Sequence, residues 1–151
     1  MTKAFNFSLQ KVLDIRGIVE DAKAADLQKA QAETELEKQR LTLVQTEKEN
    51  LVNSSDEAAH TGSVTIGELS NRTAYVDQLS DKIKEHDEAV ATSELKTDEQ
   101  RQLYIKASKD KMVMEKLKEH HHDAFKKKNN QDQVKEESEI AARTIQNEED
   151  A

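Results

Sequence analysis

The sequence predicts an all-α protein in which two long helices form an antiparallel coiled-coil hairpin, with the C-terminal helix the longer. Three observations favour this fold: the composition, two stripes of apolar residues at helical spacing, and one cluster of turn residues between the stripes. The 151 residues include no proline and no cysteine, and 36% are charged while 3% are aromatic. Such a chain has too few large apolar side chains for a compact core, whereas long charged helices tolerate this composition.

The first helix is expected over about residues 4–52. Leu9 and Leu27 are eighteen positions apart, which is five turns of a straight helix. From Leu27 the pattern continues in seven-residue steps, which are typical of a coiled coil. The stripe has these members: Leu9, Val12, Val19, Leu27, Ala30, Thr34, Leu41, Val44 and Leu51.

The reversal is expected at about residues 53–65, because this stretch holds the densest group of Asn, Ser, Asp, Thr and Gly residues. Two capping-box spacings occur here. Thr65 precedes Glu68 by three positions, and Ser54 precedes Glu57 by the same interval. Either pair is suited to the beginning of a helix.

The second helix is expected over about residues 66–146. Its stripe advances in strict seven-residue steps through Leu69, Val76, Ile83 and Val90, and it weakens at the next step, Thr97. Residues 118–146 extend beyond the first helix in this arrangement, so they are expected to lack an intramolecular partner and to form a docking segment. A frayed acidic tail follows, and residues 1–151 are interpreted as a single coiled-coil domain.

The sequence contains no recognisable catalytic, cofactor or metal site. The three glycines are too scattered for a phosphate-binding loop, and the absence of cysteine removes the thiol as a nucleophile or ligand. His120, His121 and His122 are consecutive, so on a helix they point in different directions and cannot share one metal ion. We therefore expect solvated histidines, no cofactor and no enzymatic activity.

The charge distribution restricts the choice of partners. A formal net charge of −8 argues against nucleic acid, and no apolar run is long enough for direct membrane insertion. Residues 106–128 nevertheless carry eight basic and four acidic side chains. This basic end is either an ordinary solvated surface or a face that meets an acidic partner. Without a secretion signal or cysteine, the expected location is the cytoplasm.

Three short motifs carry a resemblance to a known family. They occur at residues 5–16, 111–119 and 139–141, and they read Phe5-x-Phe7-Ser8-Leu9-x-x-Val12-Leu13-x-Ile15-Arg16, then Lys111 with Met114-Glu115-Lys116-Leu117-Lys118-Glu119, then Glu139-Ile140-Ala141. In order and spacing they resemble the flagellar type III export protein FliJ family. The His triplet and the strongly acidic tail are not features of that family's pattern.

The resemblance implies a coiled-coil stalk that binds the hexameric flagellar export ATPase and promotes its assembly and turnover. It also implies contact with the cytoplasmic domain of the export gate membrane protein and with export chaperones, at the periphery of the inner membrane. The residues implied for ATPase binding are Phe5, Phe7, Leu9, Val12, Leu13, Arg16, Met114, Leu117 and Lys118. Those implied for gate binding are Tyr75, Leu79 and His86, although seam packing explains the aliphatic members of both sets equally well.

Three other functions fit the same helical pattern. A holdase chaperone would grip unfolded clients with apolar residues at the reversal, where this sequence is polar. The stalk of a virulence injectisome would share the fold and the role. A structural spacer would only set a distance, and it would affect no ATPase.

Overall fold

A computed structural model describes residues 4–149 and contains two helices, α1 (Gln10–Thr61) and α2 (Ile66–Glu149). The chain divides into two compact units, each of which includes part of both helices. We call residues 21–105 the loop unit, and residues 1–20 together with 106–151 the terminal unit. The predicted all-α class and the longer second helix are confirmed.

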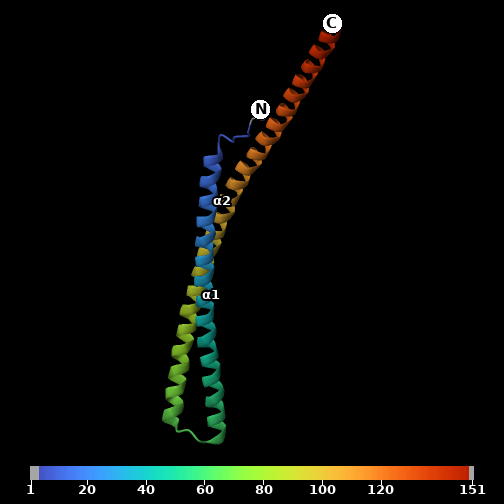
Figure 1. The fold of residues 1–151 in the computed structure, drawn as a ribbon. Helices are drawn as coiled ribbons and strands as arrows, with labels where there is room; N and C mark the ends of the chain where they lie inside the picture. The colour runs from blue at the N-terminus through green and yellow to red at the C-terminus, as the bar shows by residue number, and fades with distance from the viewer. Residues whose placement is uncertain (1–3, 150–151) are drawn as a thin grey trace. The chain divides into compact units, whose positions relative to one another are not determined.

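In the loop unit, α1 and α2 lie side by side and run in opposite directions from the loop that joins them (Figure 1). Cross-helix contacts demonstrate the antiparallel pairing, because Thr34 contacts Thr97 whereas Glu47, further along α1, contacts Tyr75 on an earlier turn of α2. In the terminal unit, the two chain segments are also antiparallel. There, Lys111 of α2 contacts Glu20, and His121 contacts Phe7, which precedes α1.

From Val76 onward, the contact between the helices of the loop unit follows the predicted seven-residue repeat, whereas Leu69, at which the repeat was predicted to begin, is 38% exposed. Val76, Ile83 and Val90 are half-buried, and Leu79 beside them is fully enclosed. Thr97 continues the same series and is also buried. Two helices alone cover only a narrow strip of each other's surface, so most of these seam residues remain partly accessible.

Near the N-terminus, the predicted stripe departs from the contact between the helices, and Leu9 precedes α1. Leu9, Val12 and Val19 are 38%, 38% and 44% exposed, whereas Leu13 and Glu20 are half-buried. The reason is the phase of the repeat. Seven-residue steps back from Leu27 reach Glu20 and Leu13, but the eighteen-residue step of a straight helix reaches Leu9.

The expected end of the first helix near residue 52 is also wrong, because α1 continues to Thr61. Ser54 and Ser55 do not break it, since their hydroxyls donate to the carbonyl of Leu51 within the helix, at 3.0 and 2.7 Å. The helix ends at Gly62, whose φ is +68°. Gly62 N–H donates to Ala59 O and Ser63 N–H to Ala58 O, which together form a Schellman motif.

The capping box predicted at the beginning of the second helix is confirmed. The backbone N–H of Thr65 donates to Glu68 Oε2 at 2.9 Å, and the N–H of Glu68 donates back to Thr65 Oγ1 at 3.3 Å. The hydrogen bonds from Thr65 lower the pKa of Glu68 below its ordinary value. The similarly spaced Ser54 and Glu57 form no cap, since both lie inside α1.

Both termini differ from the expected boundaries. α1 begins at Gln10 rather than near residue 4, and residues 4–7 are not helical. At the other end, α2 is helical to Glu149, so the tail is not frayed between residues 147 and 149. Residues 150 and 151 lie outside the described part of the chain.

Candidate protein-binding surfaces

An aromatic cluster holds the N-terminal segment of the terminal unit against α2. The ring of Phe7 is edge-on to His121 at 5.7 Å, and that of Phe5 lies 5.1 Å from His122 and 5.6 Å from Phe125. Both phenylalanines therefore contact the same helix. Residues 118–146 therefore do not all lack an intramolecular partner, because the first turns of this segment carry the cluster.

Polar contacts fix the adjoining part of α1 to α2 in the same unit. Arg16 Nη1 donates to the backbone oxygen of Asp110 at 2.7 Å, and Lys111 Nζ is 2.8 Å from Glu20 Oε2. The hydrogen bond from Lys111, followed by one from Ser108, lowers the pKa of the Glu20 carboxyl below its ordinary value. These contacts orient one face of each helix inward and leave the other face accessible.

The accessible face of α1 in the terminal unit is apolar. Ile15 and Ile18 are 60% and 68% exposed, and they lie beside the partly exposed Val12 and Val19. Single exposed aliphatic side chains are common on surfaces, whereas neighbouring ones make this face a candidate interaction site.

The accessible face of α2 in the terminal unit is apolar and basic. Met112 and Val113 are 55% and 62% exposed, and they line a shallow groove with the neighbouring residues Lys109, Lys116, Leu117 and His120. No carboxylate lines this groove. The terminal unit thus exposes apolar side chains on both of its helices.

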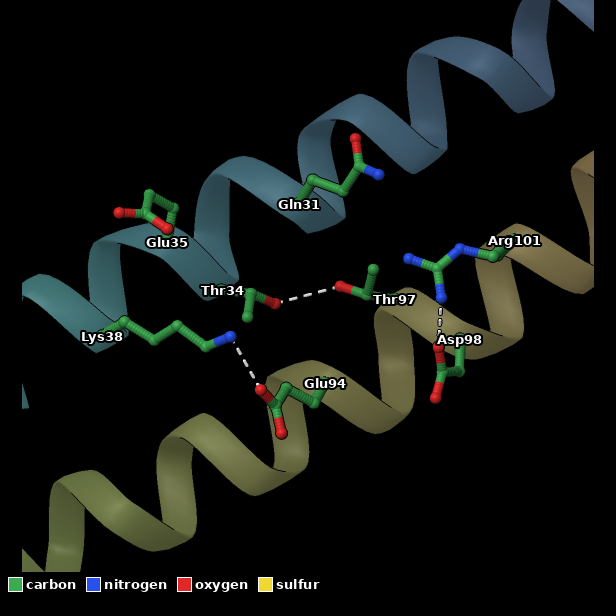
Figure 2. A pocket seen from close by; sticks show the side chains of 8 residues that line it. All are labelled: Gln31, Thr34, Glu35, Lys38, Glu94, Thr97, Asp98 and Arg101. Carbon is green, nitrogen blue, oxygen red and sulfur yellow. Dashed lines mark hydrogen bonds and ion pairs between the residues drawn. The ribbon is translucent and has the colours of Figure 1, made fainter.

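The loop unit contains a polar layer in its seam, which Figure 2 shows in close-up. Thr34 and Thr97 meet at its centre, and Lys38 Nζ lies 2.8 Å from Glu94 Oε1 at the rim. Arg101 bonds Asp98 one turn away at 2.6 Å. The surrounding groove is open and strongly charged, and it has no apolar strip.

The described residues show neither a metal site nor a membrane span. No group of three His, Cys, Asp or Glu side chains within residues 4–148 is arranged to hold a metal ion. Neither helix, over its described length, includes a stretch long and apolar enough to cross a membrane.

Comparison with known families decides the assignment. The family model described as "Flagellar FliJ protein" matches residues 5–150, which is nearly the whole chain. The chain belongs to the flagellar FliJ family. No curated protein and no solved structure gives a significant match. Membership in the FliJ family gives the protein a role connected with flagellar protein export.

The residues that the resemblance to the FliJ family implies for ATPase binding all lie in the terminal unit, but they differ in solvent accessibility. Phe7 and Met114 are 4% and 6% exposed, so they pack inside the unit and offer little surface to a partner. Leu9 and Val12 are accessible. The remaining members of the set are half-buried: Phe5, Leu13, Arg16, Leu117 and Lys118. Binding of the ATPase by these residues stays a prediction.

The residues that the resemblance to the FliJ family implies for export-gate binding lie in the loop unit, and among them only Tyr75 is exposed. Leu79 is fully buried in the seam, so its side chain cannot contact a partner while the helices are paired. His86 is half-buried, with Nδ1 3.5 Å from Glu37 Oε2. Tyr75 is 39% exposed, and its hydroxyl donates to Glu47 Oε1 at 2.5 Å, which raises the pKa of Tyr75.

Sequence reasoning missed several residues of these surfaces. Ile18, Met112 and Val113 are 68%, 55% and 62% exposed, yet none was predicted to bind. The sequence signal for these residues was that they do not follow the seven-residue repeat, because an apolar residue outside the seam faces solvent. For His121 and His122, only the structure shows that they contact phenylalanines.

Proposed function

We propose that this FliJ-family protein is a non-catalytic stalk and adaptor of the flagellar export apparatus. It binds the hexameric export ATPase through the terminal unit and promotes the assembly and activity of the ring. It also links the ring to the cytoplasmic domain of the export gate and to export chaperones. The protein acts at the cytoplasmic side of the inner membrane, where it associates peripherally with the export apparatus.

The observation that carries this proposal is the exposure of apolar side chains on both helices of the terminal unit. Ile15 and Ile18 on α1, and Val113 on α2, are each at least 60% exposed. Because these side chains lie outside the seam between the helices, a partner that covers them must contact both helices. A ring that surrounds the terminal unit would do so, and its subunits would meet different faces of an asymmetric helix pair. Unequal contacts of this kind bias subunits toward different states.

The family assignment favours a flagellar system over a virulence injectisome. The loop gives the holdase alternative little support, because Thr61, Gly62 and Ser63 are polar or small and exposed. The exposed aliphatic side chain beside them is that of Ile66, at 89%.

Binding of the purified export ATPase by the full-length chain tests the proposal. The variant Ile15→Asp/Ile18→Asp places two charges on the accessible face of α1, and it should fold because both positions are exposed. We expect the wild-type chain to co-elute with the ATPase on size exclusion and this variant to lose the complex. Leu43→Asp is the matched control, because Leu43 is 70% exposed but lies in the loop unit. Failure of the wild-type chain to bind, or equal loss in the control, would contradict the proposal.

A further inference from the structure

The groove on α2 of the terminal unit has the shape and chemistry of a helix-binding strip. Its lining residues recur at intervals of three and four, so they form one stripe along the helix: Lys109, Met112, Val113, Lys116, Leu117 and His120. The stripe spans 12 residues, or roughly 18 Å at the helical rise of 1.5 Å per residue. This is the length over which a few turns of a second helix make contact.

This stripe faces away from α1. Ala107, Lys111 and Met114 form the face of α2 that contacts α1, with Ala107 and Met114 buried and Lys111 paired with Glu20. Val113 follows Lys111 by two positions, so its side chain points about 200° around the helix from that of Lys111. No described part of the chain covers Met112 or Val113, which are 55% and 62% exposed.

The ionisable side chains that line the groove are two lysines and a histidine, Lys109, Lys116 and His120. Lys109 and Lys116 form no ion pair with any residue that the structure describes, and no carboxylate lines the groove. The groove of the loop unit differs, because Glu35, Glu94 and Asp98 lie among its lysine and arginine side chains (Figure 2). A complementary partner would place apolar side chains on Met112 and Val113 and carboxylates beside the two lysines.

We propose that an acidic amphipathic helix of the export ATPase docks in this groove. The proposal rests on the proposed function and deepens it, because it names the partner element and moves the contact from the buried Met114 to the opposite face of α2. Methionine suits such a site, since its flexible side chain adapts to the partner's surface. Asp110 and Glu119 border the stripe, so the carboxylates of the docked helix must lie beside Lys109 and Lys116 and away from these two acidic side chains.

Charge reversal in the full-length chain tests the proposal. Lys109→Glu/Lys116→Glu should weaken the affinity for the purified ATPase by about tenfold or more, and added salt should reduce the difference from wild type. The matched control is Lys82→Glu/Lys96→Glu, which changes the charge equally at exposed positions of α2 in the loop unit. Its affinity should stay within about twofold of wild type. Circular dichroism confirms that each variant is folded.

The absence of cysteine allows a direct identification of the partner element. Val113→Cys carrying a photoreactive maleimide should form an adduct with the ATPase, and the modified peptide should lie in an acidic amphipathic helix. Wild-type affinity in the Lys109/Lys116 variant would overturn the inference but not the proposed function. An adduct confined to a basic or non-helical segment would also overturn the inference. So would a label at Val113 that reacts with vesicles of anionic phospholipid but not with the ATPase. A wild-type chain that does not bind the ATPase would overturn both.

Discussion

Thr34 of α1 and Thr97 of α2 form a hydrogen bond across the seam of the loop unit, with 2.9 Å between their Oγ1 atoms (Figure 2). Each residue is 7% exposed. Thr34 Oγ1 also lies 3.0 Å from the carbonyl oxygen of Ala30, to which it donates. A hydroxyl has a single proton, so Thr97 is the donor and Thr34 the acceptor in the cross-helix bond.

This assignment predicts non-additive effects of substitution. Thr34→Val leaves the Thr97 hydroxyl buried without its acceptor, and it should lower the free energy of unfolding by about 1–2 kcal/mol. Thr34→Val/Thr97→Val removes both hydroxyls and should be close to wild type. Urea denaturation of the four chains of this double-mutant cycle measures the coupling. Additive losses in the double variant would show that the two hydroxyls do not depend on each other.

The end of α1 depends on the left-handed conformation of Gly62. Gly62→Ala should destabilise the chain by about 1 kcal/mol, because a side chain disfavours positive φ even where space is open. Gly17→Ala is the matched control, since Gly17 lies inside α1 and an added Cβ there meets nothing within 4 Å. It should stabilise the helix by up to about 1 kcal/mol. Equal shifts of both variants in thermal unfolding would argue against this account of the turn.

The contact between Glu20 and Lys111 predicts a pH dependence. Because the hydrogen bond from Lys111 lowers the pKa of Glu20, the folded state holds this carboxyl ionised more readily than the unfolded state does. The resulting stabilisation is fully present above the ordinary pKa of 4.5 and is lost as the pH falls through the lower folded-state pKa. Wild type should therefore exceed Glu20→Gln in thermal stability at pH 7, and the difference should vanish in acid. A difference that is constant with pH would rule out this linkage.

The buried ring of Phe7 should hold the N-terminal segment on α2. Phe7→Ala should lower the free energy of local opening by about 2 kcal/mol, because it removes the apolar contact with His121. Hydrogen exchange at the amide of Gln10, which donates to Phe7 O at 3.0 Å, reports this opening. Asn6→Ala is the control, since Asn6 is exposed in the same segment. Unchanged exchange in Phe7→Ala would contradict the predicted anchoring role.

Much of the fold could be predicted, because period and capping are local properties. The repeat through Val76, Ile83 and Val90 predicted the seam, and Thr65 with Glu68 predicted the beginning of α2. The end of α1 was harder to predict, because Ser54 and Ser55 are suited to either a turn or a helix, and here their hydroxyls donate within the helix to Leu51 O. Before Leu27, the eighteen-residue step to Leu9 was followed in place of the seven-residue steps to Glu20 and Leu13, which the sequence also contains.

The candidate surfaces were harder to predict than the fold. The resemblance placed the expected ATPase-binding residues in two segments far apart in the sequence, and the structure brings these segments into one unit. It could not distinguish seam from surface, so Leu79 and Met114 were chosen although both are buried. Contacts between a non-helical segment and a distant helix, such as Phe5 with His122, leave no periodic signal in the sequence.

Stimulation of the export ATPase is the most direct test of the central claim, that the terminal unit binds and activates the ring. Turnover should be measured with the wild-type chain, with Ile15→Asp/Ile18→Asp, and with the loop-unit control Leu43→Asp. We predict that wild type and the control raise the rate of ATP hydrolysis, and that the terminal-unit variant does not. Equal rates with and without the wild-type chain, or full stimulation by the terminal-unit variant, would contradict the claim.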